Sequence, residues 1–527
     1  MNRNKDLKRY IIAFVIVALV VSAFIVGMEF VRERYPQISA QNGEDISGNV
    51  IAQSFTLIVF YLMGLLLLLP FKNRLGMTHV MLLSYLVGFL TFSFISILLL
   101  SLHIYYALSS VLVVYCILTG VLYGFVLRKQ KQPHRLDKTD GIKLAFWSLV
   151  TMMVAYALAR VPMSILSYDS IQYDLLGKIY ASEHYYVDYA YYLMGGQMLV
   201  PSLMNSAAGL FGFSFAYGVQ NMFTLSGALL FGYLLFAQMR QSAMDKKRAL
   251  WAAALSTWLL AAGFFYVFLG ITLVPNILAG LEILFLMVYL YRYSQSEKTE
   301  DLVLSLVFIL AFCYTRVEGP LVSAFLLAYL AHRNLPAKKL GVYTFVVAGG
   351  VLLGYISFFA HVGLGYTGDF LSLGRSALSA GLLLTVGVYI FAKGKWFKAY
   401  NRPLSWLYFA AIVLFALGIS TLDMDKFINN LRVMYLNMFA EGLWLTAWFG
   451  VILLGVLAVF LTQKKNTFLE GVIPIYLLLM LAVFAFRTTY LHINWSDSGN
   501  RLLMHIYPLV MFVLADNLAS AFIQKKD

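Results

Sequence analysis

The sequence is poor in charge, cysteine and clustered histidine. Only 12% of its 527 residues are charged, against about a quarter in typical soluble domains. The two cysteines, Cys116 and Cys313, both lie inside apolar runs, so we expect small core residues and neither a disulfide nor a metal site. The eight histidines lack the spacing of metal ligands. These shortages exclude a secreted disulfide scaffold and a disordered, charge-rich regulator.

The chain is instead rich in apolar residues. Hydrophobic residues make up 61% of the sequence, and the mean hydropathy is +0.79. A water-soluble fold cannot bury so much, because even large domains leave about a quarter of their unfolded-chain surface exposed. The apolar runs are continuous and near 20 residues long, as spanning helices require, and do not alternate as the strands of a β-barrel do. The sequence therefore predicts an all-α polytopic membrane protein.

The apolar runs predict about 16 transmembrane helices. The first run is too long for a signal peptide and lacks a small-residue cleavage site, so we expect an uncleaved span. The run 196–213 is read as a re-entrant or interfacial helix, because a crossing there would place the basic stretch 240–248 outside. The predicted spans are 11–30, 50–70, 77–101, 104–127, 142–160, 215–238, 248–268, 273–293, 301–315, 318–332, 340–361, 377–392, 404–420, 441–463, 469–487 and 501–521.

The positive charge of the chain predicts its orientation. The net charge is +14, but no nucleic-acid partner is needed to explain it. With the N-terminus inside, about 29 of the 39 Lys and Arg residues fall in loops on one side, as the positive-inside rule requires. The prediction is a multi-pass protein of the cell membrane with both termini in the cytoplasm and a basic face toward the anionic lipid headgroups.

The longest segment outside the membrane is the outer loop 161–214. A helix is predicted from Ser170 to Ser182, with Asp169 at its N-cap and Tyr173, Gly177 and Tyr180 on one face. Partial desolvation near the membrane boundary would raise the pKa of Asp169 and suit it to act as a general base. The alternative is that Asp169 only caps the helix and that the surrounding tyrosines only anchor the loop at the interface.

Tyr168 and Asp169, followed by Tyr173 and Asp174, come shortly after a span on the outer face. This arrangement resembles the first outer loop of the GT-C superfamily of membrane glycosyltransferases, which take sugar from a polyprenyl-phosphate carrier. Many bacterial members carry Trp-Asp-x-x-x-Tyr-His there. In this chain Tyr168 stands in place of the Trp, and Asp174 stands in place of the His. The resemblance implies that Asp169 is the base and that the chain acts in a bacterial cell envelope.

Two further segments resemble the same family. The loop YTRVEGP contains Arg316 and Glu318 where members often have a basic residue before Glu-Gly, and NRLLMHIYPL contains Arg501 in a late Arg-Leu-Leu element. Asn276 stands where members often carry an Asp. This departure weakens the case for an acidic metal-binding pair; no cofactor is assigned, and a divalent metal stays open but unsupported.

The resemblance divides the chain into three parts. Residues 1–141 would form an N-terminal four-helix membrane module, 142–361 a GT-C-like catalytic core that includes the outer loop 161–214, and 362–527 C-terminal helices that complete the substrate groove. The donor would be a polyprenyl-phosphate sugar, and the acceptor a hydroxyl of a glycan, lipid or protein.

Elementary chemistry assigns roles to the few outer charges. Transfer from a polyprenyl phosphate needs a carboxylate to deprotonate the acceptor and cations to neutralise the leaving phosphate. Asp169 would supply the first, with inversion at the anomeric carbon. The cations predicted near the outer boundary are Arg316, Arg375, Arg487, Arg501 and Lys178, of which Arg316 and Arg501 would hold the phosphate. Tyr173, Asp174 and Lys178 would line the sugar or acceptor site, and Glu318 and Arg375 would contact substrate. The alternative for each arginine is contact with lipid headgroups.

A second class of function remains open, that of a transporter or lipid-linked glycan flippase. Glu282 lies in the middle of a predicted span, where a carboxylate is costly and faces a polar interior. It belongs either to an ion pathway or to a neutral, hydrogen-bonded pair. A transporter would also have paired broken helices with charge at the midplane.

Overall fold

The computed structural model describes most of the chain. Every secondary-structure element within the described residues is a helix, and none of these residues lies in a strand, which confirms the predicted all-α class. The described residues are 3–34, 46–129, 138–160, 168–187, 199–213, 216–272, 274–330, 337–362, 373–396, 423–461, 467–474, 476–477, 491–494 and 498–524.

The chain folds into two compact units. Unit 1 contains Met1–Tyr186 and Val200–Val274, and unit 2 contains Val187–Leu199 and Pro275–Lys525. This division falls between residues 274 and 275, whereas the sequence suggested boundaries after 141 and 361. The three functional domains of the sequence analysis therefore stay a prediction, and each unit is described on its own.

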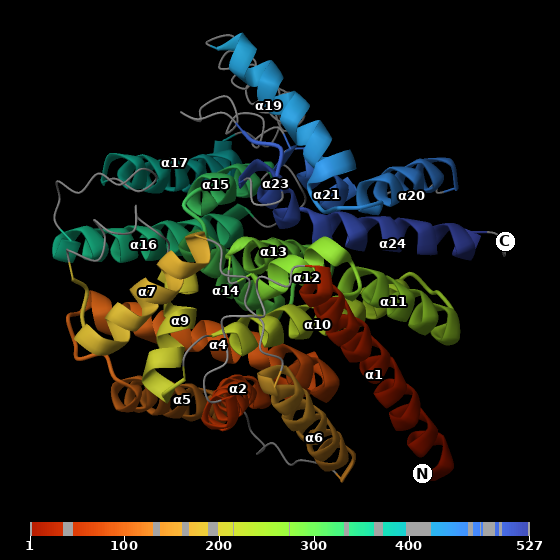
Figure 1. The fold of residues 1–527 in the computed structure, drawn as a ribbon, viewed down its shortest axis with the longest axis horizontal. Helices are drawn as coiled ribbons and strands as arrows, with labels where there is room; N and C mark the ends of the chain where they lie inside the picture. Colours follow the sequence, from red (N-terminus) through yellow and green to blue (C-terminus); the bar gives the residue numbers. More distant parts are fainter. Residues whose placement is uncertain are drawn as a thin grey trace. The chain divides into compact units, whose positions relative to one another are not determined.

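Unit 1 is a helical bundle (Figure 1). Its helices are α1 (Arg3–Arg34), α2 (Ile46–Leu68), η2 (Leu69–Phe71), α3 (Lys72–Leu75), α4 (Met77–Ser101), α5 (Leu108–Lys129), α6 (Lys138–Arg160), α7 (Tyr168–Glu183), α9 (Leu199–Phe211), α10 (Tyr217–Gln241), α11 (Lys246–Ala261) and α12 (Phe264–Ile271).

The closest helix pair in unit 1 is α2 with α4. Gly64 lies directly against the backbone at Ser84, and Gly88 lies against the backbone carbonyl of Phe60. A methyl group at either glycine would occupy the position of the facing backbone. Two glycines at matched positions therefore allow the two helix backbones to touch, as small residues do in membrane helix pairs.

Polar contacts gather at opposite ends of unit 1. Lys72 Nζ lies 2.8 Å from Asp140 Oδ2, which joins α3 to α6 within segments predicted to be cytoplasmic. The Tyr106 hydroxyl, between α4 and α5, lies 2.6 Å from Ser206 Oγ on α9, and His184 Nδ1 lies 2.7 Å from the Tyr106 carbonyl oxygen. Segments that were predicted to lie on the same side of the membrane thus contact one another. The assignment of one side as cytoplasmic stays a prediction.

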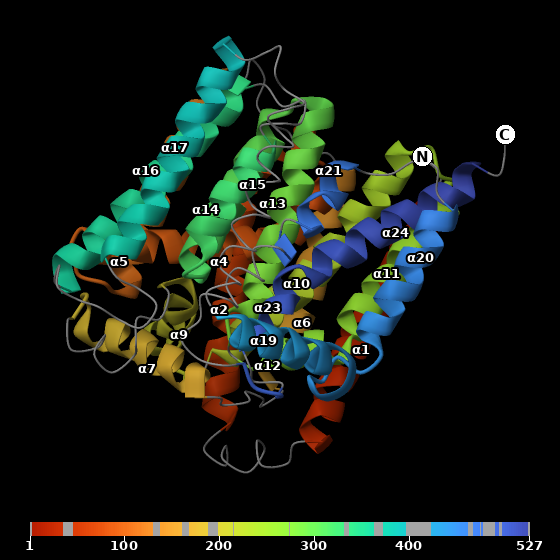
Figure 2. The same cartoon turned by 90° about the horizontal axis from the view of Figure 1, so that it is seen from above.

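Unit 2 contains the second half of the helices (Figure 2). Its core is α13, paired with α14, and every residue of α13 from its start at Asn276 to Leu290 is buried. The helices of unit 2 are α13 (Asn276–Ser296), α14 (Thr299–Thr315), α15 (Gly319–Leu330), α16 (Ala337–Val362), α17 (Leu373–Trp396), α19 (Met424–Leu436), η4 (Asn437–Glu441), α20 (Ala447–Leu461), α21 (Thr467–Glu470), α23 (Ser498–Leu502), η5 (Leu503–His505) and α24 (Tyr507–Gln524).

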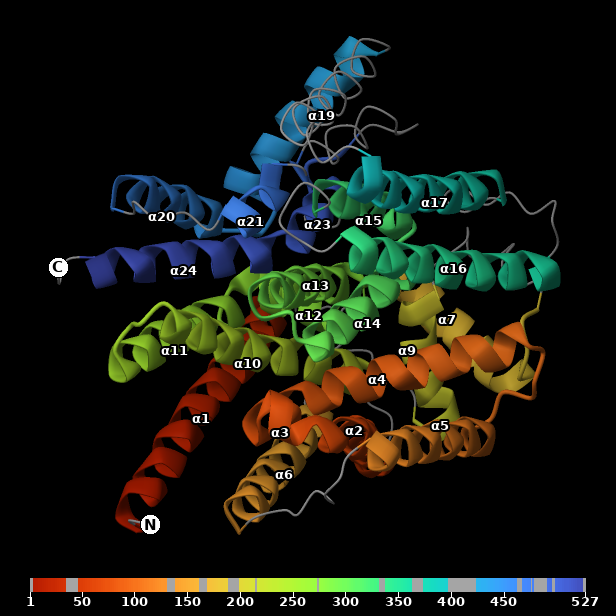
Figure 3. The ribbon, with the colours of Figure 1, turned by 180° about the vertical axis from the view of Figure 1, so that it is seen from behind.

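Two further helix pairs surround this core. Helix α16 packs along α17, and α20 packs along α24. Helix α19 runs crosswise to α20 and α24, as both faces of the ribbon show (Figures 1 and 3). Unit 2 therefore combines helices suited to cross a bilayer with one that has a different direction.

Seven helices of the described residues are long and apolar enough to cross a membrane, and nine are if each of two bent pairs counts as one span. Five shorter apolar helices add to these, among them α9, predicted to be interfacial. The structure thus shows a membrane protein with several apolar helices, while the number sixteen stays a prediction. The predicted span 404–420 lies outside the described residues, as does most of 469–487.

The predicted span 248–268 is wrong as a single helix. Helices α11 and α12 meet at an angle of 57°. The Gly263 N–H donates to the Leu260 carbonyl at 3.2 Å, and Gly263 itself adopts an extended conformation with ψ of 119°. The apolar run continues through the break, so hydropathy alone does not reveal it.

The last predicted span, 501–521, is also bent, by 43°. Pro508 is the second residue of α24 and has no N–H to donate to the Met504 carbonyl, so a continuous helix loses a hydrogen bond there. One smaller expectation is also wrong: Cys116 is exposed on α5, whereas Cys313 is buried.

Candidate functional site

The first candidate region is the pair α7 and α9 of unit 1. Tyr173, Gly177 and Tyr180 share the buried face of α7, as predicted, with the two tyrosine side chains 4% and 0% exposed. Gly177 lies directly against the backbone at Ser202, so any side chain there would collide with α9. The Ser170 hydroxyl donates to the Thr272 carbonyl at 2.7 Å. This hydrogen bond joins the first turn of α7 to the residue that follows α12.

A partly buried ion pair lies on this helix. Asp174 Oδ2 is 2.7 Å from Lys178 Nζ, and the side chains are 10% and 39% exposed. Burial raises the pKa of the Asp174 carboxyl, and the Lys178 ammonium offsets part of that rise. Oδ1 of Asp174 is buried and has no hydrogen-bond partner among the described residues. The pair therefore presents one unsatisfied carboxylate oxygen beside an accessible cation.

The predicted base Asp169 lies within α7, which begins at Tyr168 rather than at Ser170. The N-cap interpretation is therefore wrong, because Asp169 is already helical. A carboxylate in the first turn is still favoured by the partial positive charge of a helix N-terminus. The side chains of Asp169 and Arg375 lie outside the part of the structure that is described; Arg375 belongs to the first turn of α17. Arg487 lies outside the described residues altogether.

The second candidate region is the link between α14 and α15 in unit 2. Arg316 Nε lies 2.9 Å from Glu318 Oε1, with side chains 20% and 15% exposed. The link is short because the Arg316 N–H donates to the Phe312 carbonyl, and the Gly319 N–H to the Arg316 carbonyl, at 3.1 and 2.9 Å. The loop thus holds a guanidinium and a carboxylate together at the end of α14, as the Arg-x-Glu-Gly sequence suggested.

His505 of η5 lies behind this ion pair and is fully buried. Its Nδ1 lies 2.6 Å from the Tyr476 hydroxyl and 3.9 Å from Glu318 Oε1. Its Nε2 lies 3.2 Å from Asn276 Nδ2 on α13. Arg316 is held by Glu318, and Arg501 precedes His505 by about one helical turn. Three segments that are distant in sequence, represented by Asn276, Glu318 and Tyr476, therefore converge on one histidine.

A glycine and a proline make this convergence sterically feasible. Gly280 lies directly against the carbonyl oxygen of Met504, where a side chain would not fit. Because Pro508 cannot donate to that carbonyl, the Met504 oxygen is left to face α13. The same bend places His505 next to Asn276, so the local chemistry of Pro508 positions the polar cluster.

Unit 2 also contains a buried carboxyl, that of Glu282, six residues after Asn276 on α13. Glu282 is fully buried on α13, and its Oε1 accepts a hydrogen bond from the Thr315 hydroxyl at 2.9 Å. Its Oε2 has no partner within the described residues. The expected hydrogen bond of this carboxyl is confirmed, and a role in an ion pathway stays a prediction.

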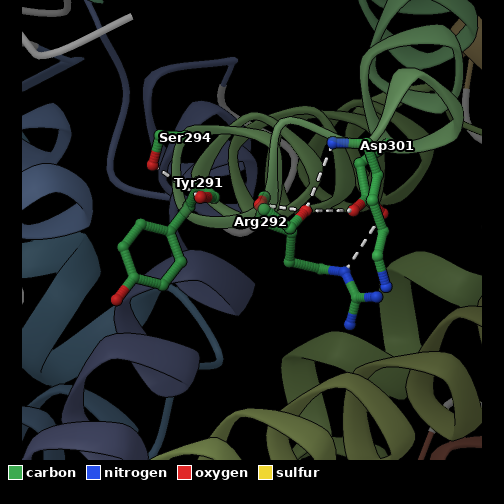
Figure 4. A network of polar contacts seen from close by, with 6 residues as sticks. Tyr291, Arg292, Ser294 and Asp301 are labelled. Carbon is green, nitrogen blue, oxygen red and sulfur yellow. Dashed lines mark hydrogen bonds and ion pairs between the residues drawn. The ribbon is translucent and has the colours of Figure 1, made fainter.

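The opposite ends of α13 and α14 carry a different network. Arg292 Nε lies 3.1 Å from Asp301 Oδ1, and Figure 4 shows the two side chains reaching toward each other from the two helices. Asn276 and Arg292 are separated along α13 by about 24 Å of helix rise. Unit 2 therefore has a polar cluster near Arg316 and a separate ion pair at its other end.

The structure brings the predicted site residues together in two groups. Tyr173, Asp174 and Lys178 lie within unit 1, and Arg316, Glu318 and Arg501 lie within unit 2. A single site that contains both groups stays a prediction. No group of three metal-ligating side chains occurs among the described residues.

Sequence reasoning missed His505 and Tyr476. One weak signal was available for His505: it follows Arg501 by four residues, which is about one helical turn. No local signal joins Tyr476 to either residue. A comparison with protein-family models, curated proteins and solved structures found no match for this chain.

The chemistry of the second cluster is that of an anion site. Two guanidinium groups with a partly buried carboxylate can bind a phosphate through charge-assisted hydrogen bonds. Asn276, Tyr476 and His505 supply donors or acceptors behind them.

Proposed function

We propose that this chain is an integral membrane glycosyltransferase. It moves a sugar from a polyprenyl-phosphate carrier to a hydroxyl of a glycan, lipid or protein acceptor on the extracytoplasmic face of the cell membrane. The proposal rests on the resemblance to the GT-C superfamily, and the observation that carries it furthest is the convergence of Arg316, Glu318 and Arg501 around His505.

The arginine cluster suits the leaving phosphate. Developing negative charge is stabilised most by cations that are already oriented in a site of limited exposure. Glu318 holds Arg316 in place at 2.9 Å, so little ordering is left for the moment of transfer. Arg501 and Arg316 would then share the phosphate oxygens.

The carboxylates of α7 suit the acceptor. Asp169 is proposed as the base that takes the proton of the acceptor hydroxyl, with attack at the anomeric carbon and inversion. Lys178 would orient the sugar or the acceptor through its accessible ammonium, and Asp174 would hold that ammonium in place. Arg375 would also contact the substrate.

The test begins with mass spectrometry of envelope glycans and lipid-linked sugars from cells with and without the protein, which identifies the transferred sugar. Transfer is then measured in membranes that contain Asp169→Asn. The expected result is a loss of about 10²–10⁴-fold in rate, the contribution of a general base. Asp423→Asn is the matched control, because asparagine caps α19 as well as aspartate does. Normal transfer by Asp169→Asn at normal expression would refute the assigned role.

A transporter or lipid flippase is the second candidate, and two observations favour it. Each unit contains a bent helix pair, at 57° and 43°, and Glu282 is a fully buried carboxyl with one unpartnered oxygen. Interrupted helices and buried carboxyls are characteristic of transport sites.

The two candidates differ in their response to Glu282→Gln. A transferase should retain most of its activity, because glutamine keeps the shape and an acceptor for Thr315. A transporter that uses the carboxyl should lose substrate movement across proteoliposomes. A cysteine pair introduced by Asp169→Cys and Arg316→Cys adds a geometric test: failure of all crosslinkers up to about 15 Å would favour the transporter, since one sugar phosphate cannot bridge more by direct hydrogen bonds.

A further inference from the structure

Helix α19 (Met424–Leu436) presents three different surfaces around its circumference. At 100° per residue, Val433, Lys426 and Asn430 fall on an arc of about 60°. Val433 and Asn430 are buried, and Asn430 Oδ1 accepts a hydrogen bond from the Leu491 N–H at 2.9 Å. Lys426 lies 3.5 Å from Asp423, with its side chain 13% exposed. This buried arc is the side that contacts the protein.

A second, apolar arc covers about 120° of the helix. Its three most exposed members are Met424, Ile428 and Tyr435, which are 46%, 56% and 61% exposed. They lie within about 40° of one another on the helical wheel. The apolar arc consists of Met434, Phe427, Leu431, Met424, Tyr435 and Ile428.

A third, polar arc separates the other two. Arg432, Asp425 and Asn429 lie at about 80–140° from Met424, with Leu436 the one apolar residue among them, and Arg432 and Asp425 are exposed. The centres of the buried, apolar and polar arcs are therefore roughly 120° apart. This is the arrangement expected of a helix that has protein on one side, lipid on the second and water on the third.

The direction of α19 agrees with this division. It runs crosswise to α20 and α24 (Figures 1 and 3), and α20 is an apolar helix of 15 residues. The sequence predicts that 441–463 and 501–521 cross the bilayer, and a helix that lies across such spans runs along the membrane plane. An amphipathic helix in that direction buries its apolar face at the boundary between headgroups and acyl chains.

The apolar arc also continues into the surface of α20. The Tyr435 ring lies 5.1 Å from the Phe439 ring, which lies 4.9 Å from the Phe449 ring on α20. Phe449 is 54% exposed, and Phe460 on the same helix is 82% exposed. A fully apolar, exposed helix of a membrane protein faces lipid, so the exposed surface of α19 is an extension of a lipid-facing one.

We propose that α19 is an interfacial helix that docks on the bilayer surface through its apolar arc. The occupant is lipid at the headgroup level, of either charge, because Asp423, Asp425, Lys426 and Arg432 sum to zero and give no preference for anionic headgroups.

The docking would also set the depth of the polar cluster in unit 2. Asn500, next to Arg501, donates to the Gly442 carbonyl at 2.9 Å and accepts from the Trp444 indole at 2.6 Å. Gly442 follows η4, which continues directly from α19. A helix fixed at the headgroups therefore holds the neighbourhood of Arg501 at that level, whatever reaction the cluster performs.

The test measures where each arc of α19 lies in a membrane. In the full-length chain with Cys116→Ser, which leaves only the buried Cys313, spin labels are attached after Ile428→Cys or Leu431→Cys on the apolar arc. Asp425→Cys and Arg432→Cys place labels on the polar arc. Each variant is reconstituted in phosphatidylcholine vesicles, and collision rates with oxygen and with a water-soluble nickel chelate are compared. Leu453→Cys, 61% exposed on α20, is the lipid reference.

The expected ratio of oxygen to nickel collisions is several-fold higher at 428 and 431 than at 425 and 432, and approaches that at 453. Equal nickel access on both arcs would overturn the proposal, because the apolar arc would lie in water. Low access to both reagents at 428 and 431 would also overturn it, since a second copy or another protein would then cover the arc. If a labelled variant fails to elute like its parent in size exclusion, Met424→Cys replaces it on the same arc.

Discussion

The region around α7 and the cluster around His505 use charge in opposite ways. On α7 an exposed cation, Lys178, neutralises a carboxylate that is mostly buried. In unit 2 a carboxylate orients Arg316, and both of these side chains are only slightly exposed, with a buried histidine behind them. Lys178 holds its charge on a flexible stem, whereas Arg316 has a planar fork fixed by its partner. The arginine cluster is therefore the better prepared to hold an anion.

This difference shows which region already holds its charged groups in the orientation that binding needs. A preoriented donor costs no reorganisation during a reaction, whereas a flexible lysine must be ordered first. Under the proposed function, the phosphate would therefore bind in unit 2, and α7 would contact the neutral parts of the substrate.

The largest effect is expected for Arg316→Ala. Transfer should fall about 10²–10³-fold, as when an oriented charge-stabilising donor is removed, and Lys178→Ala should cost clearly less. Transfer rates in proteoliposomes measure both. Lys339→Ala serves as the control, because this cation pairs only loosely with Glu297 at 3.9 Å and is 51% exposed. Equal losses for Arg316→Ala and Lys178→Ala would remove the distinction between the two regions.

The next effect concerns the glycines that hold each region together. Gly280→Ala forces a methyl group against the Met504 carbonyl and should cost about 1–3 kcal/mol, the usual range for overpacking. Gly177→Ala forces a methyl group against the backbone of α9 and should lower the stability by a similar amount. Thermal unfolding in detergent measures both.

Matched controls are available for these two glycine variants. Gly349→Ala on α16 and Gly124→Ala on α5 meet nothing within 4 Å, so alanine should leave stability unchanged or raise it by up to about 1 kcal/mol. If Gly280→Ala behaves like Gly349→Ala, the close approach of η5 to α13 does not exist.

A smaller effect is expected for Tyr476→Phe. The variant loses the hydroxyl that lies 2.6 Å from His505 Nδ1, and a net loss of about 1 kcal/mol in stability is typical of one hydrogen bond. Tyr435→Phe, on the exposed arc of α19, should be neutral. Chemical unfolding of both variants checks the pair; a neutral Tyr476→Phe would mean that the ring is held by packing alone.

The smallest effect is a pH dependence that belongs to Asp174. Its pKa is raised in the folded chain, so the protonated carboxyl favours folding below the ordinary value of 3.8 and this contribution is lost as the pH rises through the raised pKa. Asp174→Asn should remove that decline, and Lys178→Met should enlarge it. Unfolding is measured across pH 3–8 as the difference from the parent chain; identical pH profiles for parent and Asp174→Asn would contradict the assignment.

Some helices could be predicted from hydropathy alone, whereas bends and breaks within an apolar run could not. The run 77–101 corresponds residue for residue to α4, because a continuous apolar stretch of membrane length has only one favourable structure. The break at Gly263 was not predicted, because α12 is even more apolar than α11 and no polar residue interrupts the run at the break. The bend before Pro508 could have been anticipated from the missing N–H of proline.

The candidate site was predictable only where its residues are neighbours in sequence. Arg316 and Glu318 were recognised together, and the shared face of Tyr173, Gly177 and Tyr180 followed from helical spacing. The contact between Asn276 and His505 joins positions 229 residues apart, and no local pattern encodes such a contact. The roles of Asp169, Arg375 and the other predicted site residues stay predictions.

The glycine contact between α2 and α4 has a consequence for membrane thickness. Helices α2 and α4 contain 23 and 25 residues, about 35 and 38 Å of helix rise, whereas a hydrocarbon core is about 30 Å thick. Each helix must therefore tilt to match the bilayer. Because Gly64 and Gly88 lock the backbones together, the two helices cannot choose their tilt independently. In thinner or thicker membranes the two helices should change their tilt together as one rigid body. The helices packed against them would then tilt with them.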